Sequence, residues 1–487
     1  MNRVRKKGIQ VYICLVAGIF PLFFTDYYYN IQKSKSCFFI VVTIAAAVFL
    51  CVTVFLERSR NPGGVRRQKE TDICFLFLGA VVLVSSVLSP YGMVSFTGSE
   101  GRWAGSLLYL CMCGCYLMIS RNCPDISFFS LIFYTSAAVA AAVGILHFGG
   151  VDFWGFLEHV PEGVTGAYLS TLGYSNIFSG FCALLAVTAM AGFCLGGEGE
   201  ILAACFIGFL GLFVGNSDGG FFGAFAGFIF LPAVFYKRKV YLYRIIEVAA
   251  VFFAACFGAW LLGKRAVCSY TAFPGYLASW QTAAVGTVLT ACLYAAMKWG
   301  LKEGRWEQAA AKAHCFYIIF IGGAAAAVIF AFGMVNIGGL QKYGFLRITD
   351  SWGSNRGYIW QRTWELFKDA PPVRKLFGYG PDTLRLLLAQ TSRQEMLAKT
   401  GQIYDSAHND FLHLLLTTGI CGAAAWAGCF AGVCLAVWKN RREEIYPWLI
   451  PFICMFLQGF IGILQPVTTP FYFLLAGICV GLTRQNV

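Results

Sequence analysis

Charged side chains are scarce in this chain of 487 residues. Asp, Glu, Lys and Arg make up 13% of it, against about 25% in typical soluble domains. Hydrophobic residues account for 58% and aromatic residues for 17%, and the mean hydropathy is +0.66. This composition excludes an ordinary soluble protein. It indicates an integral membrane protein whose chemistry resides in loops or within the helix bundle.

The sequence also lacks the spacings that hold metals, nucleotides or disulfide frameworks. It has twenty Cys but no CxxC pair, and the densest group, Cys111, Cys113 and Cys115, falls inside an apolar run. Cysteine there behaves as a small hydrophobic residue, and Cys268, in an expected outer loop, has no partner. No GxxxxGK[ST] loop occurs, and the G-x-G of residues 378–380 opens no strand-to-helix unit. We expect no metal and no cofactor.

Long apolar runs recur along the whole chain. A bilayer-spanning helix needs about 20 such residues, and short runs can be tilted or re-entrant. The sequence therefore predicts an all-α, polytopic transmembrane bundle of 12 to 14 spans with one large, partly helical outer loop. It divides into an N-terminal bundle (1–335), the loop (336–410) and C-terminal helices (411–487). The candidate spans are 9–29, 37–56, 72–89, 104–120, 126–148, 174–195, 200–215, 219–236, 245–262, 276–297, 315–335, 411–437, 446–464 and 470–482.

Lys and Arg are concentrated in alternate connections. The basic start MNRVRKKGIQ is followed by no A-x-A-like cleavage site before TDYYYN, so we interpret it as the start of a retained anchor. The connections 57–71, 237–244, 298–312 and 438–445 are basic, whereas the short loops on the other side hold only Lys33, Lys35, Arg102, Lys264 and Arg265. The positive-inside rule then predicts cytoplasmic termini and an outward-facing loop 336–410, because long loops escape the rule.

The outer loop is expected to be partly helical. SNRGYIWQRTWELFKD predicts a helix with Ile359, Trp360, Trp364 and Phe367 along one stripe. The Pro- and Gly-rich PPVRKLFGYGPD then breaks it. A second amphipathic segment, TLRLLLAQTSRQEMLAK, is expected to lie on the bilayer surface or to cap the bundle.

Several motifs stand in a distinctive order at the expected outer ends of spans. In chain order they are GRWAG at 101–105, YLSTLGYSNIFSGF at 168–181, NRGYIW at 355–360, LFGYGPDTL at 376–384 and SAHNDFLHLLLTTGICG at 406–422. This order resembles the O-antigen ligase and O-antigen polymerase superfamily, multi-span enzymes that use lipid-linked glycans on the outer side of the cytoplasmic membrane. The resemblance covers residues 90–430. The chain departs from it at Ser217-Asp218-Gly219, where family members commonly have Ser-Arg-Gly.

The resemblance implies a metal-independent, inverting glycosyltransferase in the plasma membrane of a bacterium. It would move an oligo- or polysaccharide from undecaprenyl diphosphate to a hydroxyl of a growing glycan, a lipid core or a protein. Its partners would be that donor, the acceptor and the bilayer; the net charge of +13 then reflects the inner loops and not nucleic acid. The alternative is a glycan transporter or flippase without chemistry. A carrier should show inverted repeats and ionisable residues near the midplane.

Three arginines are candidates for holding a diphosphate. A guanidinium can bind a phosphate bidentately and stabilise the charge that develops on the leaving group. Arg356, in a Gly- and Asn-containing turn, is the main catalytic candidate, with a solvated or headgroup-binding arginine as the alternative. Arg102 and Arg347 are substrate-binding candidates, and for Arg102 interfacial anchoring by the neighbouring Trp103 remains open.

His408 is the candidate general base. A neutral imidazole where the chain re-enters the membrane can take a proton from an acceptor hydroxyl, and Asp405 or Asp410 could orient it. His413 lies about 140° further round a helix, so the two His do not share a face as zinc ligands would. Asn409 and Asn176, the latter in the Tyr174-Ser175-Asn176 turn, complete the predicted substrate-binding residues. His147 and His159 flank another outer loop, which is expected to be a solvated one.

Overall fold

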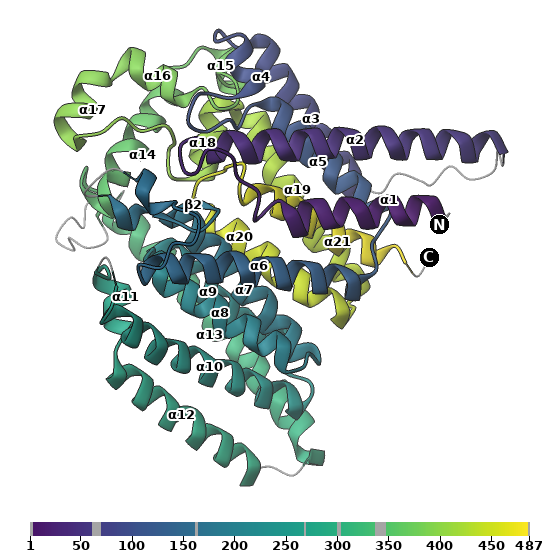
Figure 1. The fold of residues 1–487 in the computed structure, drawn as a ribbon, viewed down its shortest axis with the longest axis vertical. Helices are drawn as coiled ribbons and strands as arrows, with labels where there is room; N and C mark the ends of the chain where they lie inside the picture. The colour runs from purple at the N-terminus through teal and green to yellow at the C-terminus, as the bar shows by residue number, and fades with distance from the viewer. Residues whose placement is uncertain are drawn as a thin grey trace.

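The computed structural model describes residues 3–60, 70–160, 164–266, 269–299, 303–336 and 347–485, and these ranges are mostly helical (Figure 1). Their one sheet is a two-stranded antiparallel hairpin that pairs Tyr168 of β1 (Tyr168–Leu169) with Tyr174 of β2 (Gly173–Tyr174). The predicted all-α class is confirmed for this part of the chain. Cys268 and residues 337–346 of the expected outer loop lie outside the described residues.

The helices follow the apolar runs closely. In the first two thirds of the chain they are α1 (Arg3–Ile13), the π-helical η1 (Cys14–Ile19), α2 (Ile31–Arg60), α3 (Glu70–Leu88), α4 (Met93–Thr97), α5 (Ser106–Arg121), α6 (Ile126–Phe148), the short 3-10 turns η2 (Leu157–His159) and η3 (Thr165–Ala167), α7 (Ser175–Leu195), α8 (Gly199–Gly215), α9 (Asp218–Val234), α10 (Lys239–Gly263), α11 (Ala272–Leu277), α12 (Trp280–Trp299) and α13 (Glu303–Asn336).

The last third contains shorter helices before the chain returns to long ones. They are α14 (Trp352–Lys368), α15 (Pro372–Phe377), α16 (Leu384–Thr391), α17 (Arg393–Thr400), α18 (Asp410–Thr417), α19 (Gly419–Asn440), the 3-10 turn η5 (Glu443–Ile445), α20 (Tyr446–Gln458) and α21 (Thr469–Thr483).

Seven helices in the described residues are long and apolar enough to cross a membrane. They belong to α2, α3, α6, α7, α10, α13 and α19, and the apolar helices α5, α8, α9 and α21 are shorter. The chain is thus a multi-pass membrane protein. The span count of 12 to 14 stays a prediction, because the shorter helices cross only if they are tilted or locally matched by the bilayer.

The predicted spans 9–29 and 411–437 differ most from the helices observed, and the helix in the span predicted at 446–464 ends earlier, at Gln458. The run 9–29 stops being helical at Ile19, and the ammonium group of Lys35 donates hydrogen bonds to the carbonyls of Phe20 (2.6 Å) and Pro21 (2.8 Å) that a continued helix would have used. The run 411–437 is divided into α18 and α19 between Thr418 and Gly419, where φ of Gly419 is +72°.

Helix α7 lies at the centre of the bundle. It packs against α8, α9 and α20, and most of its side chains are buried. Small residues allow the close approach of α7 to α8: a Cβ on Gly208 or Gly215 would press on the backbone of Ala186 or Ser179. This close packing gives the loops at the end of α7 a firm base.

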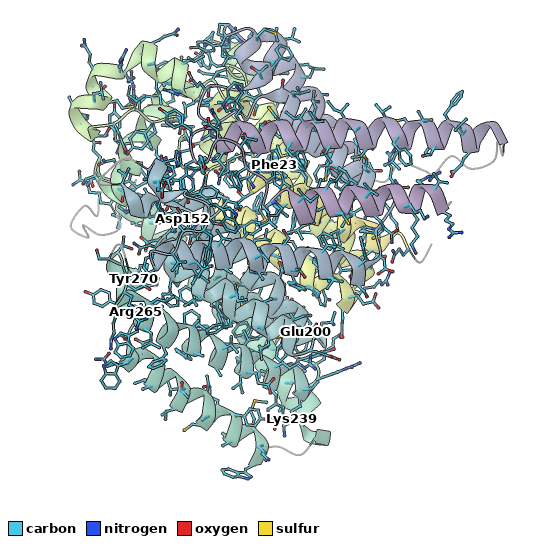
Figure 2. The ribbon with its side chains drawn as sticks, in the orientation of Figure 1. Phe23, Asp152, Glu200, Lys239, Arg265 and Tyr270 are labelled. Atoms are coloured by element: carbon cyan, nitrogen blue, oxygen red, sulfur yellow. The ribbon has the colours of Figure 1, made fainter. Side chains whose placement is uncertain are left out.

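The connections gather at two opposite ends of the bundle. Asp72, at the start of α3, forms ion pairs with Arg484 (2.6 Å), at the end of α21, and with Arg121 (3.3 Å), at the end of α5. These three helix ends, all predicted to lie on the cytoplasmic side, are therefore close together. Figure 1 shows α1 and the end of α21 at this same end. In Figure 2, Arg265 lies at the other end of α10 from Lys239. These ends agree with the alternation expected from the sequence, and the orientation in the membrane stays a prediction.

The segment 347–410 forms a small hydrophobic core of its own over the second end of the bundle. Leu384, Leu387, Leu388 and Met396 of α16 and α17 are buried with Ile359 of α14. The second amphipathic segment thus caps the bundle, as two short helices and not one. Trp364 does not join the buried stripe: its exposed fraction is 45%. Within the stretch expected to break the helix, residues 372–377 form the short α15.

Candidate functional site

His408 lies in the connection between α17 and α18, where the hydrophobic core of segment 347–410 meets the bundle. We call this junction the mouth. Its backbone is left-handed (φ +49°), and its N–H donates to the Ser406 hydroxyl (3.1 Å). The ring of Tyr404 meets the imidazole edge-on with centroids 5.6 Å apart. Both neighbours fix the half-buried imidazole in place. Oδ1 of the next residue, Asn409, accepts the N–H groups of Phe411 and Leu412 and caps α18.

The surroundings keep His408 neutral. Burial lowers the pKa of its imidazole to about 4, and the positive charges of Arg356 and Arg102 act in the same direction, whereas Asp405 opposes them. At neutral pH the side chain is therefore a proton acceptor. Of the two carboxylates expected beside it, Asp405 acts on His408. Asp410 is buried, and its backbone N–H donates to the carbonyl of Gly459 (2.7 Å).

Arg356 begins the regular part of α14. The three residues before it, Gly353, Ser354 and Asn355, all have positive φ, so the chain turns sharply into the helix there. Burial lowers the pKa of the Arg356 guanidinium, while Asp218 and Tyr404 raise it. The Tyr404 hydroxyl donates to the carbonyl of Ser354 (3.3 Å), two residues before Arg356, and the Tyr404 ring meets His408, so this end of α14 and the loop of His408 are neighbours. Asp218, at the position where the sequence departs from the resemblance, is thus close enough for its charge to act on Arg356.

Arg102 is buried in a network of acceptors and is not open to solvent. Its Nε donates to Asp382 (2.9 Å), one terminal nitrogen donates to the carbonyl of Leu464 (2.5 Å), and the other lies 3.7 Å from Asp405. The three nitrogens of the guanidinium are engaged with protein groups. Its charge reaches His408 through space.

Asp382 is the residue of this site that the sequence did not reveal. Its side chain is fully buried and accepts the backbone N–H groups of Ser99 (2.7 Å) and Ala104 (3.0 Å) besides the guanidinium. The only local signal is an acid after Gly-Pro in a turn, and the donors lie about 280 residues earlier. The Gly-Pro turn predicted only the end of a helix, and not that its acid would bind Arg102.

The hairpin β1–β2 reaches the same mouth. Burial raises the pKa of the Tyr174 hydroxyl, and the neighbouring Tyr168 and Tyr404 add to the effect. Tyr174 is 45% exposed, and Asn176 lies in the first turn of α7 directly behind it. The Tyr174-Ser175-Asn176 turn and the loop of His408 are therefore neighbours, although they are far apart in sequence.

Other predicted residues have different surroundings. Arg347 is exposed, and the charged groups that act on His408 do not include it. His413 is buried on α18. His147 is buried and not part of a solvated loop: its Nδ1 pairs with the Tyr28 hydroxyl (3.1 Å) and its Nε2 lies 3.4 Å from Asp152.

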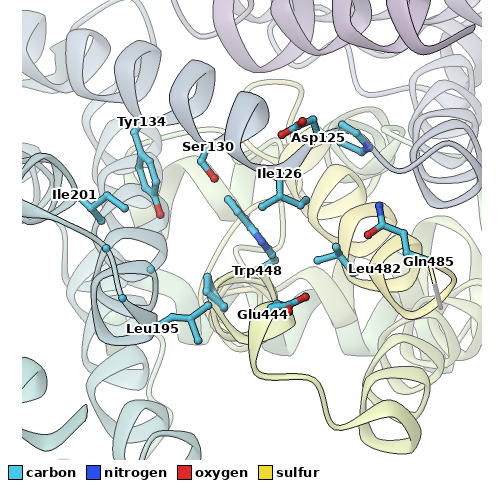
Figure 3. A pocket seen from close by; sticks show the side chains of 15 residues that line it. Asp125, Ile126, Ser130, Tyr134, Leu195, Ile201, Glu444, Trp448, Leu482 and Gln485 are labelled. Atoms are coloured by element: carbon cyan, nitrogen blue, oxygen red, sulfur yellow. The ribbon is translucent and has the colours of Figure 1, made fainter. Parts of the chain in front are cut away.

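A cavity of about 610 Å³ opens at the other end of the bundle (Figure 3), where α6 and α20 begin and α7 and α21 end. Its two acidic side chains already serve the protein. Asp125 caps α6 by accepting from Ser127 and Phe128, and Glu444 binds Arg442. Charged groups of both signs converge instead at the mouth around His408, which we take as the candidate site.

Comparison with known protein families gives a match that overlaps the candidate site. The family model described as O-antigen ligase matches residues 275–427, a range that includes Arg356, Asp382 and His408 but not Arg102 or Asn176. No curated protein matches the chain. The match covers less than half of the chain, and it supports the resemblance of the motifs to the O-antigen ligase superfamily.

Proposed function

We propose that this chain is a glycan transferase that moves an oligo- or polysaccharide from undecaprenyl diphosphate to an acceptor hydroxyl. The site would face the outer side of a bacterial plasma membrane, with both chain termini in the cytoplasm. The observation that carries the proposal is the convergence of a half-buried arginine, Arg356, and a neutral histidine, His408, at one mouth of the bundle. The family indicates glycosyltransferase-like activity.

Each residue has a definite task in the proposed reaction. The acceptor oxygen attacks the anomeric carbon as the bond from that carbon to the diphosphate oxygen breaks. His408 takes the proton of the acceptor hydroxyl, and Arg356 binds the departing diphosphate. A single displacement of this kind inverts the anomeric configuration. The guanidinium supplies the positive charge, so the reaction requires no metal ion.

The remaining predicted residues fit around this pair. Asn176 and the exposed Tyr174 would contact sugar hydroxyls in this proposal. Arg102 contributes its charge from behind the site, because its nitrogens are occupied. Asn409 supports the site through the cap of α18, and Arg347 stays a candidate for a more distant contact with the donor.

The proposal is tested with purified protein in detergent, a synthetic undecaprenyl-diphosphate oligosaccharide and a set of acceptors. A positioned base contributes about 10² to 10⁴ in rate, so His408→Ala should lose most turnover and retain donor binding. His159→Ala, at an exposed outer-loop histidine, is the matched control. Turnover should persist in excess EDTA. Full activity of His408→Ala, or loss of wild-type activity on chelation with recovery on adding a divalent ion, contradicts the mechanism.

A further inference from the structure

The turn that carries Asp382 is locked against the bundle from several sides. The Ser89 hydroxyl donates to the carbonyl of Tyr379 (2.6 Å), and Gly380 N–H donates to the carbonyl of Thr417 (2.8 Å). Gly380 has φ +111°, and a Cβ there would meet the hydroxyls of Ser89 and Ser95. The position of the Asp382 carboxylate is therefore set by α3, α4 and α18 together.

From this fixed position Asp382 organises the 98–105 loop. Two of its bonds hold the backbone of Ser99 and Ala104, and the third holds Nε of Arg102. The guanidinium is then directed at the Leu464 carbonyl on one side and at Asp405 on the other. Asp382 and Arg102 together thus join four segments that are far apart in the chain.

The last residue in this series of contacts, Asp405, lies at the mouth, in the loop that carries His408. Asp405 is 42% exposed, unlike the buried pair behind it. The charged groups that act on His408 are Arg356 of α14, Asp405 of its own loop and Arg102 of the 98–105 loop. The nearby His413 of α18 and the Tyr404 ring complete its titratable surroundings. Two of these three charges are arranged by Asp382.

We propose that Asp382 is a positioning residue for glycan transfer: it fixes Arg102, and through it Asp405, and so sets the charge balance around His408. Its side chain is fully buried and cannot touch the substrate. The inference rests on the proposed role of His408 as the base.

Asp382→Asn tests it, because the amide keeps the shape and removes the charge. Arg102 then loses its buried counter-charge and draws Asp405 more closely to itself, and both changes make the surroundings of His408 more positive. The acid limb of kcat, measured with saturating donor, should move to lower pH by on the order of one pH unit. We expect kcat to fall about 10- to 100-fold with the donor KM within about threefold, since Arg356 is unchanged.

Three further variants separate positioning from general damage. Asp382→Asn with Arg102→Gln removes both charges and should return the limb toward its wild-type pH. Asp405→Asn, at a half-exposed carboxylate, should move the limb in the same direction as Asp382→Asn and tests the series of contacts even where the buried variant does not fold. Asp369→Asn, at an exposed acid of the same loop, should change nothing.

An independent readout keeps the inference distinct from the proposed function. The pH dependence of His408 acylation by diethyl pyrocarbonate, followed by mass spectrometry of its peptide, reports its protonation without glycan transfer. It should shift as the kcat limb does, and it remains informative if the wild type transfers nothing. An unshifted His408 in both Asp382→Asn and Asp405→Asn, or loss of folded protein alone with unchanged kcat and pH limb, overturns the inference.

Discussion

At the scale of single residues, His408 and Arg356 depend on one another through the diphosphate that the site is proposed to hold. Without the donor, Arg356 lowers the proton affinity of His408, because protonation would bring two positive charges close together. A bound diphosphate would neutralise that field. The imidazole would become a stronger base when donor is present.

This dependence predicts two different pH profiles. The pKa of His408 is about 4, so the free protein keeps its base neutral above that pH and kcat/KM should fall only as the pH drops through about 4. The acid limb of kcat, which reports the complex with donor, should lie at higher pH. Steady-state kinetics from below pH 3 to pH 8 measures both limbs. Coincident limbs would show that the donor phosphates do not approach His408.

Arg356→Lys is the second prediction at this scale. Lysine keeps the charge but loses the planar fork that binds two phosphate oxygens, so turnover should fall by about 10² to 10³. Arg393→Lys, at an exposed arginine of α17, is the matched control and should remain within about twofold of wild type. Initial rates normalised to folded protein compare the two. Similar rates for both variants would move Arg356 to a structural role.

The sequence indicated those site residues whose neighbours in the chain are themselves distinctive. His408 stands beside Asn and Asp at a boundary between polar and apolar segments, and Arg356 stands in a turn of Gly and Asn. It could not reveal Asp382 or the burial of Arg102, because a buried ion pair is defined by partners that the fold brings together. Nothing near Arg102 in the chain indicates that its charge is already compensated.

At the scale of elements, the break between α18 and α19 places the site at the bundle surface. Gly378 and Gly419 both have φ +72°, and a Cβ on either would overlap the backbone of the opposing segment, at Thr417 or Leu376. The turn before the GPD sequence is thereby inserted between the two helices. The apolar run alone suggested one continuous helix, because the contact that divides it comes from a different part of the loop.

Gly378→Ala should therefore be more damaging than a glycine substitution of the same backbone type elsewhere. Gly401 also has positive φ (+71°) but has open space around its Cβ position. Alanine at Gly401 should cost about 1 to 2 kcal/mol from the left-handed backbone alone, and alanine at Gly378 should cost more because backbone must also move. Thermal unfolding in detergent with transfer rates measures both. Equal losses of stability in the two variants would show that the turn at Gly378 is not tightly packed between α18 and α19.

At the scale of the whole molecule, the orientation in the bilayer decides whether the site can meet its donor. The positive-inside rule predicts cytoplasmic termini and an outward loop, and the bundle gathers its connections at two opposite ends as that requires. Single cysteines in place of Glu395 and Glu200, on a background without Cys, probe the two ends. An impermeant thiol reagent should label position 395 in intact cells and position 200 only after lysis. The reverse pattern would overturn the mechanism, because the donor is expected on the outer side.

Most helix boundaries of the bundle could be predicted from the sequence, because burial in lipid demands long apolar runs with polar ends. The runs near 126–148 and 174–195 match α6 and α7 almost residue for residue. The separate core of residues 347–410 could not be foreseen, since its amphipathic helices fit a bilayer surface equally well. Only tertiary packing decides whether these helices lie on the bilayer surface or form a cap over the bundle.

The pairing of Arg102 with Asp382 has a consequence for how the chain is made. The acid follows the arginine by 280 residues, and synthesis at about 5 to 20 residues per second puts tens of seconds between them. A newly inserted chain must hold this cation at the membrane surface until its partner is translated. The outer mouth should therefore close last during biogenesis, and a nascent chain arrested before residue 382 should leave the 98–105 loop open to protease.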